Sequence, residues 1–189
     1  MPSQIVLLRG INLGAVNRIS MPQMRDALAA GGFTGPDGGP VRTYLQSGNI
    51  AVESSLDPDA LAWAVEGLVA ESFDVVAPTV ARTEEQLQRL VDLNPFPEPA
   101  RQGPKAYQVS FLSEEIGATG RQLIDERSQN GDTVAVSDSA REVYAWHPGG
   151  IHTSKLAEQL SERKLGVRVA TARNWTTVLA CLGLLDADG

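Results

Sequence analysis

The chain has 189 residues, a length that fits one large domain or two small ones. Its formal net charge of −7 disfavours sequence-independent binding to nucleic acids or anionic membranes, unless positive charge is concentrated locally. The single cysteine, Cys181, excludes a disulfide within the chain, and its apolar neighbours predict a buried side chain. No apolar stretch approaches the length of a membrane span and the N-terminus does not resemble a signal peptide, so we expect a cytoplasmic protein.

The first half of the chain predicts strands and helices in the order β-α-β-β-α-β, followed by a further helix. Residues typical of helix N-termini, Ser20, Asp57 and Thr83, mark the three helix starts. Pro78 cannot donate to a sheet ladder, which places the fourth strand at a sheet edge. This order is the ferredoxin-like plan. The expected strands are residues 5–9, 41–46, 49–54 and 75–82, with a tight turn at Ser47–Gly48 between the second and third.

The second half repeats this order. Thr119 and Gln122 have capping-box spacing, which predicts the start of a helix. Two further helices are expected over residues 153–166 and 173–185. The expected strands are residues 105–112, 133–137, 142–148 and 167–171.

Between the halves, residues 94–104 contain four prolines, which is typical of a stiff linker. We therefore predict an α+β protein with two internally duplicated, ferredoxin-like halves, residues 1–93 and 105–189.

Two polar loops stand out in the first half, RGINLGAVNR (9–18) and QSGN (46–49). A crossover helix makes the first and second strands parallel, so both loops should lie at the same edge of the sheet. We expect a shared rim at this edge. Its candidate ligand-binding residues are Arg9, Asn12, Arg18, Gln46, Ser47 and Asn49.

The predicted rim has features of a site for a small anion, such as a phosphate, a carboxylate or a nucleotide. Its glycines allow close approach to backbone N–H groups, the first helix points its positive end there, and two guanidinium groups can grip oxygen atoms. The alternative is that the glycines and asparagines only form turns. The loop matches neither a Walker A motif nor G-x-G-x-x-G.

The third polar stretch, ATARNWTTV (170–178), is expected at the start of the last helix. Arg173 and Asn174 are further candidates for ligand contacts, and they would complete the rim site only if this helix docks there. The alternative is a capped helix in which Trp175 packs between the two domains.

Other chemistry finds little support in the sequence. His147 and His152 are too few for a zinc site, and Ser47 does not lie in a nucleophile elbow. The motif loops contain no carboxylate pair, so no catalytic residue, metal or cofactor is predicted. RNA-recognition modules share the strand order, and Tyr107, Tyr144 and Trp146 of the second half could stack on bases. The acidic balance disfavours such binding.

Four segments in the same order resemble the family known as domain of unknown function 1697: RGINLGAVNRISM, YLQSGN, NPF (94–96) and TARNWTTV. The chain departs from the family pattern at Ala15, Arg18, Ala172 and Thr176. The resemblance covers nearly the whole chain and implies a bacterial, cytosolic protein with two ferredoxin-like halves. It implies no reaction.

Three hypotheses follow for the function. The first is a protein that binds a small anion or nucleotide at the rim. The second is a regulatory or assembly module whose motifs are structural. The third is a nucleic-acid-binding protein that uses the aromatic residues of the second half. The sequence does not predict an oligomeric state.

Overall fold

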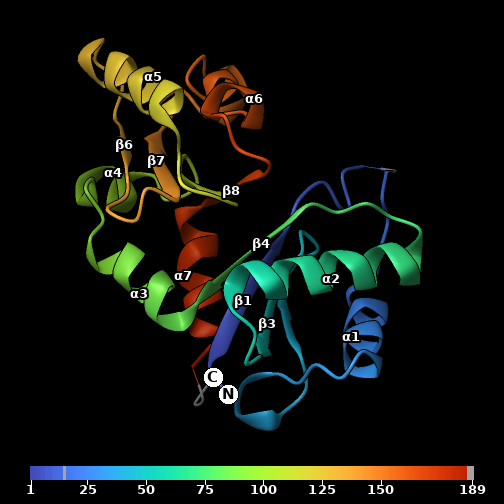
Figure 1. The fold of residues 1–189 in the computed structure, drawn as a ribbon. Helices are drawn as coiled ribbons and strands as arrows, with labels where there is room; N and C mark the ends of the chain where they lie inside the picture. Colours follow the sequence, from blue (N-terminus) through green and yellow to red (C-terminus); the bar gives the residue numbers. More distant parts are fainter. Residues whose placement is uncertain (15, 187–189) are drawn as a thin grey trace. The chain divides into compact units, whose positions relative to one another are not determined.

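The computed structural model describes residues 1–14 and 16–186 (Figure 1). It is a mixed α+β chain with two four-stranded sheets, in which all neighbouring strands are antiparallel. The first sheet has the order β2-β3-β1-β4 and consists of β1 (Ser3–Leu8), β2 (Arg42–Tyr44), β3 (Asn49–Glu53) and β4 (Thr79–Thr83). The second has the order β6-β7-β5-β8 and consists of β5 (Tyr107–Leu112), β6 (Val134–Val136), β7 (Glu142–Trp146) and β8 (Ala170–Asn174).

The matching strand orders are consistent with two similar halves, as the sequence predicts. The described helices are α1 (Met21–Ala30), α2 (Pro58–Phe73), α3 (Glu84–Asp92), α4 (Pro97–Gln102), α5 (Ala118–Gln129), α6 (Glu162–Leu165) and α7 (Trp175–Gly183). Three single turns of 3₁₀-helix are η1 (Pro36–Gly38), η2 (Ile151–Thr153) and η3 (Ala157–Gln159).

The chain forms two compact units. One comprises Met1–Arg89 together with residues 180–186, and the other comprises Leu90–Leu179. The proline-rich residues 94–104 therefore belong to the second unit, where they include α4. The divisions between the units fall within α3 and within α7.

The first unit has a core between one face of its sheet and helices α1 and α2 (Figure 1). Alternate residues of a strand share one face, so Val6 and Leu8 of β1 point to this core together. Met24 and Leu28, four residues apart on α1, meet them from the helix side. The Asp57 carboxylate caps α2 by accepting the Ala60 N–H at 2.9 Å, which confirms the predicted helix start.

The second unit is built in the same way around α5 and α6 (Figure 1). Leu112 of β5 and Val143 of β7 lie on the sheet face that packs against Ile124 of α5 and Leu165 of α6. The other β5 side chains, which include Tyr107 and Val109, point to the opposite face of the sheet, away from this core.

The structure corrects two details in the first half. The fourth strand begins at Thr79, and Pro78 lies just before it, with its carbonyl accepting the Arg9 N–H at 2.8 Å. β4 is an edge strand, as Pro78 indicates. The hairpin between β2 and β3 is longer than the predicted two-residue turn, because Tyr44 pairs directly with Asn49. Residues 45–48 therefore form the turn, with positive φ at Leu45 and Gly48.

Three predictions in the second half are wrong. The Thr119 capping box does not form; α5 follows Gly117, which has no side chain to cap it. The expected helix over 153–166 is broken into η2, η3 and α6, because the Ser154 hydroxyl caps a single turn at Ala157 and Gly166 ends α6 in the left-handed conformation. The last helix begins at Trp175, since Arg173 and Asn174 still belong to β8.

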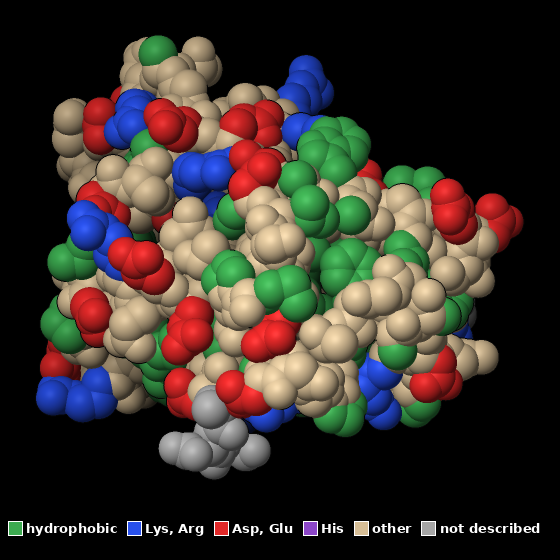
Figure 2. Space-filling view, turned by 60° about the horizontal axis from the view of Figure 1, so that its bottom comes forward, with side chains coloured by type: hydrophobic (Ala, Val, Ile, Leu, Met, Phe, Trp, Pro, Cys, Tyr) green, Lys and Arg blue, Asp and Glu red, His purple; other side chains and the backbone are tan. Residues whose placement is uncertain are grey.

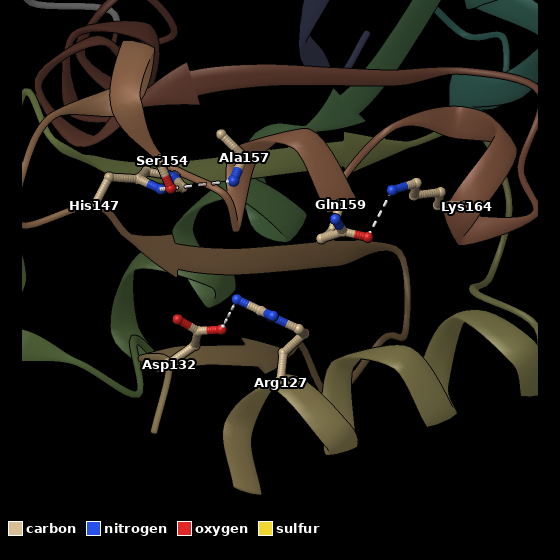
Figure 3. A network of polar contacts seen from close by, with 7 residues as sticks. All are labelled: Arg127, Asp132, His147, Ser154, Ala157, Gln159 and Lys164. Atoms are coloured by element: carbon tan, nitrogen blue, oxygen red, sulfur yellow. Dashed lines mark hydrogen bonds and ion pairs between the residues drawn. The ribbon is translucent and has the colours of Figure 1, made fainter. Parts of the chain in front are cut away.

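A buried histidine anchors the irregular segment after β7 (Figure 3). His147 is 1% exposed, and its Nδ1 lies 2.7 Å from the Ser154 hydroxyl, which also accepts the Ala157 N–H at 3.2 Å. Its Nε2 is buried and has no hydrogen-bond partner in the part of the chain that the structure describes. Burial lowers the pKa of His147, and the carboxylate of Asp132, which is ion-paired with Arg127, opposes this shift.

We expect acid to destabilise the protein through His147. The pKa of its imidazole is lower in the folded chain than its ordinary value of 6.5, so the unfolded chain binds more protons as the pH falls. The stabilisation is complete above the unfolded pKa and is lost as the pH falls through it towards the folded pKa. Urea unfolding of the wild type from about pH 7.5 to about pH 5 should show this loss of free energy of unfolding.

His147→Asn should flatten that pH profile, because the asparagine does not ionise. His152→Asn is the matched control, since His152 is exposed on η2. Equal slopes for the wild type and His147→Asn would contradict the assignment of the acid-sensitive group.

Candidate functional site

The two polar loops of the first unit are joined by the side chain of Asn12. Its amide nitrogen donates to the carbonyls of Gln46, at 2.6 Å, and of Ile19, at 2.9 Å. Its amide oxygen accepts the Ile19 N–H at 2.9 Å. The expected meeting of the two loops at one edge of the sheet is therefore confirmed.

The first loop is a small hairpin that folds back on itself. The Asn12 N–H donates to Asn17 O at 3.0 Å, and the Asn17 amide donates to Gly10 O at 3.0 Å. Asn12 and Asn17 adopt the left-handed conformation, with φ of 54° and 50°, which asparagine tolerates better than most residues. These bonds fix the loop tip relative to the start of α1.

A hollow of about 460 Å³ lies between the two loops and the first turn of α1, and we name it the α1 cup. Arg18 is exposed, and its Nε donates to Gly14 O at 3.2 Å. Neither of its terminal nitrogens has a hydrogen-bond partner among the described residues. The described residues that line the cup include no carboxylate. The lining residues are Asn12, Gly14, Arg18, Ile19, Ser20, Gln23 and Gln46.

The helix end contributes less to the cup than the sequence predicts. The Ser20 hydroxyl accepts the Gln23 N–H at 3.4 Å, the Ser20 carbonyl accepts the Met24 N–H at 3.0 Å, and Pro22 has no N–H to offer. The same Ser20 hydroxyl donates to the Gln23 side-chain oxygen at 2.7 Å. Attraction of an anion to this hollow therefore depends on side chains, with Arg18 as the source of charge.

The other predicted rim residues lie outside the cup lining. Arg9 is exposed just beyond β1, and Ser47 is exposed on the hairpin. Asn49 is fully buried, and its amide donates to Tyr44 O at 2.9 Å and to the Ser47 hydroxyl at 3.0 Å. Asn49 therefore holds the hairpin in shape and does not reach the cup, which corrects its predicted place on the rim.

Arg173 and Asn174 belong to the second unit, at the end of β8. Arg173 is 9% exposed, and its Nη1 donates to the Thr171 hydroxyl at 2.8 Å and to Ala172 O at 2.9 Å. The Asn174 side-chain oxygen accepts the Thr177 N–H at 2.9 Å, so Asn174 caps α7. Trp175 is buried against Tyr107, with ring centroids 5.4 Å apart. The capping alternative therefore describes Asn174 correctly, and Trp175 packs against Tyr107 of the same unit.

The aromatic residues proposed for base stacking are mostly enclosed. Tyr107 and Tyr144 are 0% and 2% exposed and stack on each other, 6.4 Å apart. Their hydroxyls donate to the Asn94 side chain at 2.6 Å and to Leu90 O at 2.8 Å. Burial raises the pKa of both phenols, and their mutual proximity adds to the shift at Tyr107. These two rings therefore serve the interior of the second unit.

A second hollow, of about 430 Å³, brings together the other two motifs that carry the family resemblance. Asn94 from NPF and Trp175 from ARNW both line it, between α4 and α7. Sequence reasoning did not find this hollow, because residues 94–104 read as a linker. Their apolar residues between prolines were the signal for a packed helix. The lining residues are Asn94, Pro97, Ala100, Arg101, Pro104, Trp175, Thr176 and Leu179.

Residues 1–14 and 16–186 contain neither a cluster of metal ligands nor a membrane-spanning helix. No group of three or more His, Cys, Asp or Glu side chains there is placed to hold a metal ion. No helix in the same residues is long and apolar enough to cross a membrane.

Comparisons with known proteins agree with the fold. A conserved bacterial protein, SP0830 from Streptococcus pneumoniae, has a similar solved structure, with a TM-score of 0.67 and 19% sequence identity over 98% of this chain and 99% of that one. At this identity the likeness shows the fold alone. A comparison with the curated proteins gave no match. The model of the family described as "Protein of unknown function (DUF1697)" matches residues 1–144, and the chain therefore belongs to the DUF1697 family.

Proposed function

We propose that the first unit binds a small anionic ligand in the α1 cup, with Arg18 as the opposing charge. The carrying observation is that Arg18 is the one charged group among the described lining residues, and that its terminal nitrogens have no partner in the described chain. The two loops contain Arg9 and Arg18 but no Asp or Glu, although the whole chain carries a net charge of −7. The loop rim is therefore a locally positive place on an acidic protein.

The chemistry of the cup favours a phosphate or carboxylate group, since the planar fork of a guanidinium matches both. The side chains of Gln23 and Gln46 are exposed beside Arg18 and can donate further hydrogen bonds. Arg9 and Ser47 would act as outer rim residues, and Arg9 would contribute long-range attraction. Asn49, Arg173 and Asn174 have structural bonds of their own and are left out of the proposed contacts.

Arg18→Gln should weaken binding by on the order of tenfold or more, since it removes a charge-assisted contact. Isothermal titration with inorganic phosphate, ribose 5-phosphate and adenosine monophosphate would measure the effect. Arg121→Gln is the matched control, because Arg121 is an exposed arginine on α5 in the second unit. Unchanged affinity in Arg18→Gln would rule out the cup as the site, and no binding by any of these anions would remove the proposal.

A second candidate function is a non-enzymatic regulatory or assembly module in which the motifs are structural. The specific observation in its favour is that the amides of Asn12, Asn49 and Asn174 all form hydrogen bonds within the chain. Asparagines that fix turns and caps need no ligand to explain them. The two candidates differ in what they predict for Arg18, whose side chain makes one hydrogen bond, to Gly14 O, among the described residues.

The structural role of Asn12 can be measured directly. Asn12→Gly keeps the left-handed backbone accessible but removes three side-chain hydrogen bonds, so it should lower the free energy of unfolding by about 2 kcal/mol. Asn12→Ala should cost about 1 kcal/mol more, because alanine is strained at positive φ. Urea unfolding of both variants would measure these two losses in the free energy of unfolding. Wild-type stability in Asn12→Gly would show that the two loops do not depend on this side chain.

We also infer that the two halves are ferredoxin-like units that arose by duplication. In each sheet an arginine on the edge strand lies opposite the third residue of the central strand: Arg82 opposite Ile5, and Arg173 opposite Val109. Each donates its Nη1 to the carbonyl of the residue before it, at 2.7 Å and 2.9 Å. The residue after each arginine, Thr83 or Asn174, caps the following helix.

We also propose a cytoplasmic location. It is compatible with a single cysteine, since such chains need no oxidising compartment. Binding to nucleic acid is the least supported of the three hypotheses, because the protein is acidic and Tyr107 and Tyr144 are buried.

A further inference from the structure

The two loops that contribute to the α1 cup also carry large apolar side chains that are exposed. Leu13 is 67% exposed and Val16 is 61% exposed, and both lie on the tip of the first loop. Leu45 is 56% exposed and directly precedes Gln46, a lining residue of the cup. Of the nine large apolar side chains that are exposed in the described chain, these three lie on the two loops. Single exposed apolar residues are common, but a group of them beside a hollow indicates a binding surface.

The backbone holds these three residues in a common place. Leu13 and Val16 form a backbone bridge, in which the Val16 N–H donates to Leu13 O at 3.1 Å. The bond from Asn12 to Gln46 O ties this tip to the hairpin that carries Leu45. The two loops therefore carry Arg18 and Gln46, which line the cup, together with three exposed aliphatic side chains. On the face that Figure 2 shows, acidic and basic side chains are interspersed.

Leu45 is an unexpected residue for its position. Its φ is 57°, a region that disfavours residues with a Cβ and suits Gly or Asn. Its side chain is also exposed, so it adds little to the core. A leucine that is both strained and exposed is not explained by the stability of the hairpin, and an apolar contact with a ligand would explain it.

We propose that the ligand of the α1 cup is an amphiphilic anion, which carries an aromatic or apolar group next to its phosphate or carboxylate. This inference rests on the proposed function. Arg18 holds the anionic group, and Leu13, Val16 and Leu45 pack against the apolar group. A nucleoside monophosphate has this chemistry, whereas inorganic phosphate has only half of it.

The size of the hollow agrees with such a ligand. Its volume of about 460 Å³ lies in the range of small-molecule sites, which is roughly 300 to 1,000 Å³, and exceeds what a bare oxyanion fills. A membrane surface is a poorer match, because recognition of anionic lipid uses clusters of roughly four to eight basic residues and the two loops supply Arg9 and Arg18.

The test compares two ligands with the same phosphate, adenosine monophosphate and ribose 5-phosphate. We expect the full chain to bind adenosine monophosphate about tenfold more tightly in isothermal titration, since the base adds apolar contact. The triple variant Leu13→Ser, Val16→Ser, Leu45→Ser should lose this difference and leave the affinity for ribose 5-phosphate unchanged. Arg18→Gln should weaken both ligands. Leu56→Ser is the matched control, because Leu56 is an exposed leucine of the same unit, away from these loops.

A single variant provides a second test in case the triple variant does not fold. Leu45→Asn places a residue that tolerates positive φ in the turn, so its melting temperature should equal or exceed that of the wild type. Its affinity for adenosine monophosphate should still fall, whereas that for ribose 5-phosphate should not.

The outcomes separate this inference from the proposed function. Equal binding of the two ligands, or a preference that survives the triple variant, would overturn the amphiphilic ligand and leave the anion site in place. Binding of neither ligand would overturn both. Sedimentation with phosphatidylserine vesicles that depends on Leu13, Val16 and Leu45, in the absence of small-ligand binding, would also overturn it in favour of a membrane surface.

Discussion

The Asn12 side chain is the interaction on which the candidate site depends. One amide group bonds to Ile19 on both its donor and acceptor sides and to the Gln46 carbonyl across to the hairpin. Ile19 is buried and directly precedes the cap of α1, so the same bonds tie the loop to the helix and its core. The position of Arg18 is set between these anchored neighbours. A flexible loop here would present the same residues without a defined hollow.

Features fixed by local chemistry could be predicted from the sequence. The side-chain oxygens of Asp57 and Thr83 accept the N–H groups three residues later, so the starts of α2 and α3 could be predicted from residue type and spacing. The convergence of the two loops followed from chain connectivity alone, because a crossover helix sets strand direction. By contrast, Thr119 had the same spacing and formed no cap. Sequence spacing permits a cap, but packing decides whether the helix begins there.

The roles of single polar residues were harder to predict, because one residue type serves several purposes. The sequence predicts both Asn12 and Asn49 as rim residues, but Asn49 is fully buried and forms hydrogen bonds within its own hairpin. The difference comes from the side-chain alternation of β3, which begins at Asn49 and turns its first side chain to the sheet face opposite the helices. Ile50 and Val52 of the same strand belong to the core on the helix side, so Asn49 points to the other face.

The four segments that carry the predicted family resemblance fall into two pairs, one at each hollow, and the polar groups of the two pairs are used differently. In the second unit the polar groups are used internally: Asn94 accepts from Tyr107 and from the Phe96 N–H, and Trp175 is buried. In the α1 cup, Arg18 retains bonding capacity, and Leu45, next to the lining residue Gln46, is both strained and exposed. Features that cost stability and serve no interior contact are typical of binding sites. For this reason we propose the α1 cup as the binding site and not the second hollow, although a larger share of the second hollow's lining is apolar.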